Sequence, residues 1–238
     1  MSDLLTIPAR FNGPERSANG GYTCGRVAGL LDAEAASVSL RRPPPLERPL
    51  RVAFGQGRVE LRDDGELVAE GAADELLIDV PEAVTPDRAA AASRAGREHW
   101  TRAHPFPGCV VCGPRRAPGD GMRVFPGTLG DGLFAADWIP DESLSGDDDG
   151  IVRPECVWAA LDCPTSAPVA NFGQGPPMVL ARLTARLASP VRVGEAHALV
   201  SWRLGVEGRK RHGACALFDS EGRLLCASRA LWIELKQG

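Results

Sequence analysis

The sequence lacks a long run of apolar residues. Its longest apolar stretches lie around residues 225–235 and 178–183, and arginine interrupts both. Because a membrane-spanning helix needs about 20 mostly apolar residues, we expect no such helix. The first residues also lack a basic start followed by an apolar core, which is the pattern of a secretory signal. We therefore expect a cytoplasmic protein without membrane partners.

The sequence also lacks an excess of positive charge. Lys and Arg together number 27 against 31 Asp and Glu, which gives a formal net charge of -4. Nothing in this balance would hold a phosphate backbone, so nucleic acid is not an expected partner. The seven cysteines are odd in number and irregularly spaced, which argues against a disulfide framework and fits a reducing compartment.

What is present is an ordinary globular composition, with 44% hydrophobic and 24% charged residues in a chain of 238. This length corresponds to one large domain or two small ones. Residues 35–80 alternate apolar and polar side chains at period two, with Pro- and Gly-rich turns between the runs, which predicts an antiparallel meander. Residues 20–31 before it predict a helix. Gly21, Gly25 and Gly29 lie on one stripe, which suggests a helix pressed backbone-close against a curved sheet, or else a loop.

The same order of elements returns in the second half. Residues 155–163 predict a short helix, because Pro154 suits a first helical turn and Pro164 ends it. Strands are expected at 122–125, 133–138, 178–187, 198–204, 213–218 and 223–234. Residues 64–73 and 221–230 also share an acid-Gly-charged-Leu-aliphatic-small pattern. We therefore expect a duplication, with repeats at 1–87 and 119–238 and a linker at 88–118 that holds a helix and a Cys-x-x-Cys loop.

A short helix followed by a meander, twice in one chain, resembles the double hot-dog fold of acyl-CoA thioesterases. That resemblance implies an α+β protein with two antiparallel sheets, each wrapping a central helix. Many hot-dog thioesterases carry His-Gly-Gly at the mouth of this helix and an acid seven residues past the second Gly. Here Asn19-Gly20-Gly21 matches the first element, but Ala28 stands at the acid position; the second repeat has Arg153-Pro154-Glu155 in place of the glycines and keeps the acid as Asp162. The resemblance thus implies two complementary half-sites on antiparallel helices.

A second motif agrees with this resemblance. Cys109-Val-Val-Cys112-Gly113-Pro114, followed by Gly121-Met-Arg123, looks like the segment that precedes the first strand of some hot-dog thioesterases. The chain departs from the thioesterase II branch, which implies a Gln near the end of the last strand. None is found around residues 228–231, and this puts that branch's water-holding network in doubt.

Thioester hydrolysis needs donors for an oxyanion and a base or nucleophile across the carbonyl. We expect the backbone N–H groups of Gly20 and Gly21 to be the donors, because a helix start leaves such groups unpaired. Asp162 is the expected base or attacking carboxylate, although an acid at a helix end also makes local hydrogen bonds. Thr165 is a candidate to hold the water, or else a simple cap. Asn19 and Tyr22 are candidate substrate contacts, with an N-cap turn and core packing as their plainer interpretations.

Arg209 and Arg211 lie at an expected hairpin, where they would meet the phosphates of coenzyme A or simply remain solvated. Acyl-CoA is therefore the expected small-molecule partner, and a homo-oligomer is compatible with the sequence. His99, His104, Cys109 and Cys112 have a spacing compatible with a zinc knuckle. One Cys-x-x-Cys with two such histidines is a weak signal, so we expect no metal and no cofactor.

The leading hypothesis is an acyl-CoA or acyl-carrier thioesterase with a composite site between the two helices. A non-catalytic protein that binds acyl thioesters stays open, because fold does not settle activity. The segment starting at His104 (His-Pro-Phe-Pro-Gly) is similar to a motif of hot-dog dehydratases. That motif leads into the central helix, whereas a loop and a strand are expected here, so dehydration is the lesser alternative.

Overall fold

A computed structural model describes residues 4–146, 150–170 and 175–235. Three α-helices lie in these ranges: α1 (Gly20–Ala28), α2 (Pro86–Ala103) and α3 (Pro154–Asp162). Short 3-10 turns are η1 (Ala9–Phe11), η2 (Glu142–Leu144) and η3 (Cys163–Ser166). The strands of the first half are β1 (Leu4–Leu5), β2 (Ala35–Leu40), β3 (Leu50–Gly55), β4 (Arg58–Asp63) and β5 (Glu66–Ala73). Those of the second half are β6 (Gly127–Gly130), β7 (Leu133–Trp138), β8 (Met178–Leu187), β9 (His197–Glu207), β10 (Lys210–Phe218) and β11 (Leu224–Glu234).

All eleven strands form one antiparallel sheet in the order β1-β3-β4-β5-β2-β8-β11-β10-β9-β7-β6. The expectation of two separate sheets is therefore wrong. The two halves meet where β2 pairs with β8, from Ala35 opposite Arg186 to Ser39 opposite Arg182. An exposed strand edge carries unpaired N–H and C=O groups, and this pairing satisfies the inner edge of each half.

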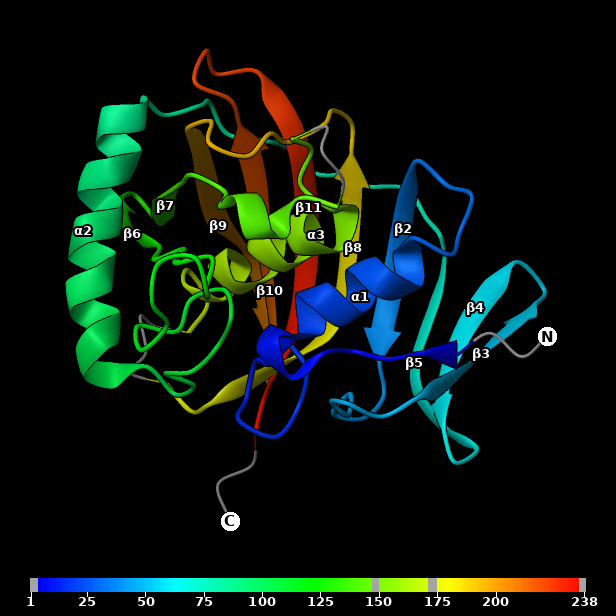
Figure 1. The fold of residues 1–238 in the computed structure, drawn as a ribbon. Coiled ribbons are helices and arrows are strands. Elements are labelled where there is room, and N and C mark those ends of the chain that lie inside the picture. The colour runs from blue at the N-terminus through cyan, green and yellow to red at the C-terminus, as the bar shows by residue number, and fades with distance from the viewer. Residues whose placement is uncertain (1–3, 147–149, 171–174, 236–238) are drawn as a thin grey trace.

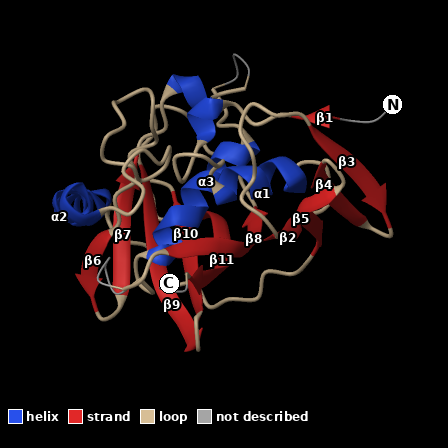
Figure 2. Ribbon diagram, turned by 90° about the horizontal axis from the view of Figure 1, so that it is seen from below, coloured by secondary structure: helices blue, strands red, loops and turns tan. Residues whose placement is uncertain are grey.

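The helices α1 and α3 lie side by side on one face of the sheet (Figures 1 and 2). They run antiparallel, because Gly21 faces the end of α3 and Gly25 faces its start. A Cβ added at Gly21 would lie 2.8 Å from the Trp158 carbonyl oxygen, and one added at Gly25 would lie 2.8 Å from the Trp158 Cβ. Two of the three regularly spaced glycines thus bring helix against helix, and not helix against sheet as expected.

The opposite face of the sheet is covered by an extended segment between β5 and α2. Leu76, Ile78 and Val80 of this segment pack on a small cluster that includes Ala216 and Phe218 of β10. Leu217 between them belongs to the main core under the helices. This alternation follows from the period of two along a strand, and it shows that β10 is covered on both faces.

Helix α2 stands at one end of the sheet, beside β6 and β7 (Figure 1). Its N-cap is Thr85, whose hydroxyl accepts a hydrogen bond from the Arg88 N–H, and Pro86 opens the first turn. Small residues allow close packing here: a Cβ at Gly127 would lie 2.9 Å from the backbone N of Gly96 in α2. The expected helix in the 88–118 segment is therefore present and extends from Pro86 to Ala103.

Several expected elements differ from the structure: β9 and β10 are each longer by at least three residues than expected, and two further differences have a clear physical reason. Residues 122–125 do not form a strand. Met122 and Val124 instead donate backbone hydrogen bonds to the carbonyls of Val110 and Val111, and Arg123 between them has a φ of 60°, which interrupts an extended chain. Helix α1 ends at Ala28, three residues before the expected end, because the N–H groups of Leu30 and Leu31 bond the carbonyls three residues back, in the tighter turn that ends many helices.

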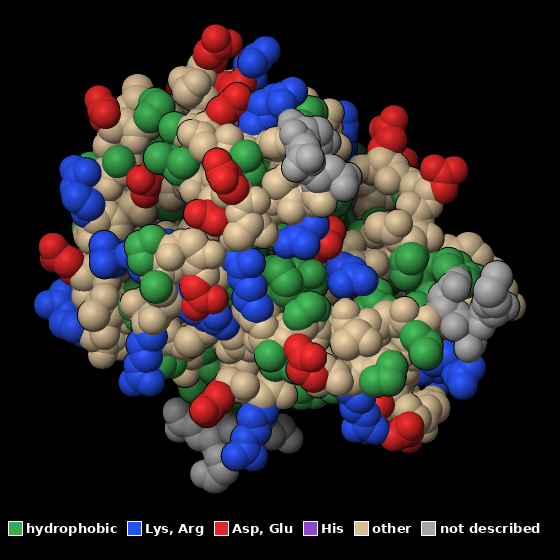
Figure 3. All heavy atoms as spheres, viewed as in Figure 1, with side chains coloured by type: hydrophobic (Ala, Val, Ile, Leu, Met, Phe, Trp, Pro, Cys, Tyr) green, Lys and Arg blue, Asp and Glu red, His purple; other side chains and the backbone are tan. Residues whose placement is uncertain are grey.

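Charged side chains of both signs are interspersed over the face shown in Figure 3. No continuous basic surface is visible on that face. In the described ranges, none of the helices has the length and apolar character needed to cross a membrane.

Candidate functional site

The side chain of Asp162 lies where the end of α3 meets the start of α1. Its Oδ2 accepts a hydrogen bond of 2.9 Å from the backbone N–H of Gly21. The first N–H groups of a helix lack partners within the helix and carry the positive end of its dipole, so a carboxylate is favoured there. The residue is 1% exposed. The antiparallel packing of two helices far apart in sequence thus brings together the Gly pair and the acid, as the resemblance implied.

Asn19 connects the two helices from the N-cap position of α1. Its Oδ1 accepts the Tyr22 N–H at 2.8 Å, which caps the helix. Its Nδ2 is 3.4 Å from Asp162 Oδ2 and also approaches the Sγ atoms of Cys163 and Cys109, at 3.7 and 3.9 Å. One buried amide therefore fixes the helix start and faces the carboxylate.

Burial raises the pKa of Asp162 from its ordinary value to about 7. The hydrogen bonds from the Gly21 N–H and the Asn19 amide lower this pKa, whereas the nearby Cys109 sulfur raises it. Asp162 Oδ1 is buried and, within the described part of the chain, has no hydrogen-bond partner. Buried polar atoms are almost always paired, so this unpaired carboxylate oxygen is an unusual feature, of the kind that a bound water or a catalytic role explains.

The two glycines of α1 differ in what their N–H groups do. That of Gly21 is already bonded to Asp162. For the N–H of Gly20, no hydrogen bond is found among the residues that the structure describes. Gly20 is half-buried, and its Cα side packs against Leu40 and Leu180 of the sheet. Gly20 is therefore the available donor at this helix start, and Gly21 holds the acid.

Other candidates have structural contacts. The Thr165 hydroxyl donates to the Asp162 carbonyl at 2.6 Å and accepts the Trp232 Nε1–H at 2.8 Å, which ties the backbone of Asp162 to β11. Tyr22 is buried and its ring stacks on Phe11 at a centroid distance of 3.9 Å. Desolvation raises the pKa of the Tyr22 hydroxyl.

The two arginines expected to meet coenzyme A lie at the start of β10. The Arg211 guanidinium forms an ion pair of 2.5 Å with Glu234, and Arg209 donates to the Glu234 carbonyl oxygen. The structure thus places these charges against the end of β11, where an acid already neutralises Arg211.

Sequence reasoning missed a group of three cysteines beside Asp162. The Sγ atoms of Cys109, Cys112 and Cys163 all lie within 4.8 Å of one another. Hydrogen bonds from the Cys112 and Cys163 side chains hold the pKa of Cys109 well below its ordinary value. Burial lowers the pKa of His104, whose Nε2 lies 3.2 Å from Cys112 Sγ. Only the packing of the loop on the end of α3 reveals the third cysteine, because it lies far from the Cys-x-x-Cys pair in sequence.

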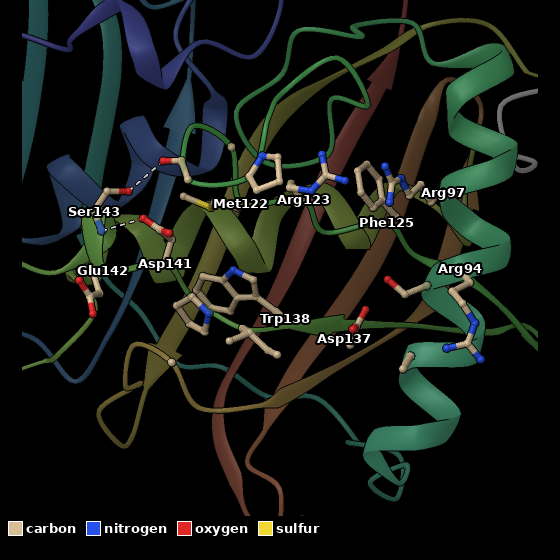
Figure 4. A pocket seen from close by; sticks show the side chains of 18 residues that line it. Arg94, Arg97, Met122, Arg123, Phe125, Asp137, Trp138, Asp141, Glu142 and Ser143 are labelled. Carbon is tan, nitrogen blue, oxygen red and sulfur yellow. Dashed lines mark hydrogen bonds between the residues drawn. The ribbon is translucent and has the colours of Figure 1, made fainter.

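A cavity of about 810 Å³ lies between α2, the loop before β6 and the end of β7. Figure 4 shows Arg94 and Arg97 of α2 on one side of it with Asp137 near them, Arg123 beside Phe125 towards the middle, and Asp141 and Glu142 on the other side. The guanidinium carbons of Arg97 and Arg123 lie 6.0 and 5.4 Å from the centroid of the Phe125 ring. Burial and the neighbouring Arg97 charge lower the pKa of Arg123.

No protein-family model matches the sequence, and a search of curated proteins finds no match. Solved structures do match. A proposed thioesterase from Novosphingobium aromaticivorans has a TM-score of 0.65 at 14% identity, covering 98% of this chain and 95% of its own. A tesB protein from Mycobacterium avium subspecies paratuberculosis has a TM-score of 0.62 at 12% identity, covering 97% and 91%.

A third structure names the fold. A protein of unknown function from Alicyclobacillus acidocaldarius, described as having a hot-dog fold, has a TM-score of 0.53 at 11% identity and covers 99% of this chain and 93% of its own. The chain has a hot-dog fold. These matches cover nearly the whole chain, so the shared fold includes both halves of the molecule.

In this hot-dog fold α1 and α3 are the helices packed on the concave sheet, and Asp162 lies at their junction. The His104 segment leads through the cysteine loop and not into a central helix. It therefore differs from the dehydratase motif that it resembles.

Proposed function

We propose that this hot-dog protein hydrolyses an acyl thioester at the junction of α1 and α3. The observation that carries the proposal is the Asp162 carboxylate, held by the Gly21 N–H at 2.9 Å with its other oxygen buried and unpaired. The likeness to a structure named as a thioesterase supports this class of reaction.

In this proposal the acyl carbonyl oxygen approaches the N–H of Gly20. Water attacks the carbonyl carbon while Asp162 Oδ1 accepts its proton, and the negative charge that develops on the carbonyl oxygen is stabilised by the helix start. The carbon–sulfur bond then breaks, and the departing thiolate takes up the proton. Gly21 and Asn19 orient Oδ2, and Thr165 holds the Asp162 backbone in place.

The test is a hydrolysis screen over acyl-CoA thioesters of increasing chain length, with Asp162→Asn beside the wild type. Asn keeps the shape of the side chain and removes the base, a loss that typically lowers kcat by about 10²–10⁴-fold. Glu155→Gln is the matched control, because it neutralises an acid in the first turn of the same helix. Full activity in Asp162→Asn, or an equal loss in Glu155→Gln, would contradict the assignment.

Coenzyme A is the proposed carrier, and the cavity beside α2 is the proposed place for its phosphates. Three arginines and three acids, Asp137, Asp141 and Glu142, line this cavity. The charge of Arg97 is close enough to lower the pKa of Arg123, whereas Arg211 is already paired with Glu234. A cluster of like charges is stabilised by an anion, and Arg is well suited to phosphate. The cavity volume also lies in the range of small-molecule sites.

The double variant Arg97→Gln/Arg123→Gln should raise KM for acyl-CoA and leave kcat nearly unchanged. A short thioester without the nucleotide should show no change, because it has no phosphate. The double variant Arg209→Gln/Arg211→Gln is the control. A KM effect confined to this control would place the phosphates at the hairpin instead.

A second candidate is a protein that binds acyl thioesters without cleaving them. The observation that favours it is the enclosure of the acid: Asp162 is 1% exposed and one of its oxygens already holds the Gly21 N–H. Calorimetric titration with non-hydrolysable acyl-CoA analogues separates the candidates. Tight binding by a wild type that cleaves no thioester in the screen would establish the binding protein.

We also infer that the chain arose by duplication. Outward from the β2–β8 pair, the first half continues with β5, β4 and β3, and the second half with β11, β10 and β9. The two segments that share a sequence pattern, 64–73 and 221–230, include all of β5 and the first part of β11. Their equivalent places in the sheet support an origin from one ancestral unit.

A further inference from the structure

Three cysteines from two distant segments converge beside the helix junction. Cys109 and Cys112 belong to the loop after α2, and Cys163 follows the last residue of α3. The Sγ atoms of Cys109 and Cys163 are 3.8 Å apart, and all three sulfurs lie within 4.8 Å of one another. None of the three is in a disulfide.

These spacings suit a metal ion. Zinc binds thiolates at about 2.3 Å, which places two sulfurs of a tetrahedral site about 3.8 Å apart. The Cys109–Cys163 pair already has this spacing. The remaining sulfur needs to move by at most about 1 Å to complete a regular tetrahedral face.

The Cys109 loop has a backbone shape that favours such a site. The Gly113 N–H donates to the Cys109 carbonyl at 2.9 Å, which closes the turn between the two cysteines. A Cβ at Gly113 would lie 2.5 Å from the Cys109 backbone N, so only glycine allows the chain to fold back this closely. Backbone hydrogen bonds from Cys112 and Val111 also lower the pKa of Cys109.

Further N–H donors surround the sulfurs. Asn19 Nδ2 approaches two of them, at 3.7 and 3.9 Å. His104 Nδ1 accepts the Phe106 N–H at 2.9 Å, so in the neutral ring Nε2 carries the proton and donates to Cys112 Sγ. His104 is therefore a hydrogen-bond donor to a thiolate and not a metal ligand.

We propose that Cys109, Cys112 and Cys163 bind one Zn²⁺ ion as thiolates, with a water in the fourth position. Binding releases the thiol protons to solvent. Two positive charges against three negative ones leave a net negative site, which the surrounding N–H groups stabilise. The ion would join the loop after α2 to the end of α3, and so would fix the segment next to Asp162. This site replaces the expectation of a metal-free protein, and it does not depend on thioester hydrolysis.

The first test is the zinc content of protein purified without chelators. We expect about one zinc per chain in the wild type and in Cys156→Ser, which changes a buried cysteine earlier on α3. Cys112→Ser and Cys163→Ser should retain little zinc. His104→Ala should still bind, with an affinity lowered by about 10–100-fold, because it removes only an outer partner.

The second test identifies the ligands. Co²⁺ titrated into metal-free protein should give sulfur-to-metal charge-transfer absorption, which weakens with each of the three cysteines replaced and is unchanged in Cys156→Ser. Removal of zinc should lower the Tm of the wild type and leave that of Cys163→Ser unchanged, because that variant has no zinc to lose. This comparison distinguishes a lost ligand from a misfolded variant.

The proposal is overturned if folded wild type contains no stoichiometric metal and takes up neither Zn²⁺ nor Co²⁺ under reducing conditions. It is also overturned if Cys163→Ser binds zinc as the wild type does, since the Cys-x-x-Cys pair would then act without α3.

Discussion

Gly21 combines two functions that need a residue without a side chain. Its N–H holds the Asp162 carboxylate, and its Cα surface lies against the backbone of α3. A Cβ there would lie 2.8 Å from the Trp158 carbonyl oxygen and 2.9 Å from the Ala159 Cα. These neighbours belong to a buried helix backbone and cannot move away as a flexible side chain does. Both the stability of the helix pair and the position of the Asp162 carboxylate therefore require that residue 21 has no Cβ.

We expect Gly21→Ala to lower the free energy of unfolding by about 1–3 kcal/mol through overpacking. Gly29→Ala is the control at the end of the same helix, where the nearest atom to a Cβ is a carbonyl oxygen at 3.4 Å. Gly29→Ala should be neutral or stabilise by up to about 1 kcal/mol, because Ala loses less chain entropy on folding. Urea denaturation measures both, and an equal loss in the two variants would refute the close-packing argument.

At the same scale, some of the site follows from sequence and some does not. Asp162 and Gly21 were paired by the family resemblance, and the hydrogen bond between them agrees with that pairing. The sequence could not predict that the Gly21 N–H bonds Asp162 while the Gly20 N–H stays available, because this depends on which N–H group the carboxylate reaches. Cys163 was missed for a similar reason. A residue after a helix joins a distant loop only when tertiary packing brings the two together.

Among the elements, η3 is held in place by a close approach of β10. A Cβ at Gly213 would lie 3.0 Å from the Thr165 carbonyl carbon and nearer still to its oxygen. The same turn carries the Thr165 hydroxyl that bonds the Asp162 carbonyl. The strand thus supports the backbone that presents the acid.

Gly213→Ala should destabilise the protein by about 1–3 kcal/mol and also reduce thioester hydrolysis, because η3 must shift to admit the methyl group. Gly205→Ala in the neighbouring strand β9 is the control, since nothing lies within 4 Å of a Cβ there. Thermal denaturation and the acyl-CoA assay check the two effects. Loss of stability in Gly205→Ala would show that glycine in these strands matters for another reason.

Elements with strong periodic patterns were predicted well. The residues of β7 and β8 match their predicted ranges, because alternation and flanking turn residues marked both ends. Residues 122–125 are as apolar as a strand, yet they pair with the cysteine loop and turn at Arg123. A short apolar run indicates that its residues are buried. Its backbone conformation depends on the segment with which it forms hydrogen bonds, which the run itself does not reveal.

At the scale of the whole molecule, sequence could not decide between one sheet and two. The inner edge strand of each half, β2 or β8, has N–H and C=O groups that could bond water or the edge strand of the other half. The sequence of either strand is compatible with both arrangements. The ladder between them is supported by side chains: Thr184 Oγ1 bonds Ser37 Oγ at 2.9 Å, and Arg182 Nε donates to Ser39 Oγ at 2.9 Å. These contacts and the α1–α3 junction make the two halves one folding unit.

A destabilising substitution in the first half should therefore also lower the stability of the second half. All five tryptophans lie at or after position 100, so none belongs to the first half, although Trp158 of α3 packs against α1. Tryptophan fluorescence therefore reports on α2, on the second half and on the junction of the two helices. Leu61→Ala in β4 removes a fully buried side chain and should cost about 2–5 kcal/mol. If unfolding is cooperative, the fluorescence midpoint in urea should fall together with the midpoint from circular dichroism.

Phe54→Ala in the adjacent strand β3 is the control, since that ring is 58% exposed and its loss should move neither midpoint appreciably. A Leu61→Ala protein whose fluorescence transition stays at the wild-type midpoint, while circular dichroism shows an earlier transition, would mean that the halves unfold separately. The continuous sheet would then be a contact between two independent units. Coincident shifts would instead show that pairing of β2 with β8 makes the site at the helix junction depend on the stability of both halves.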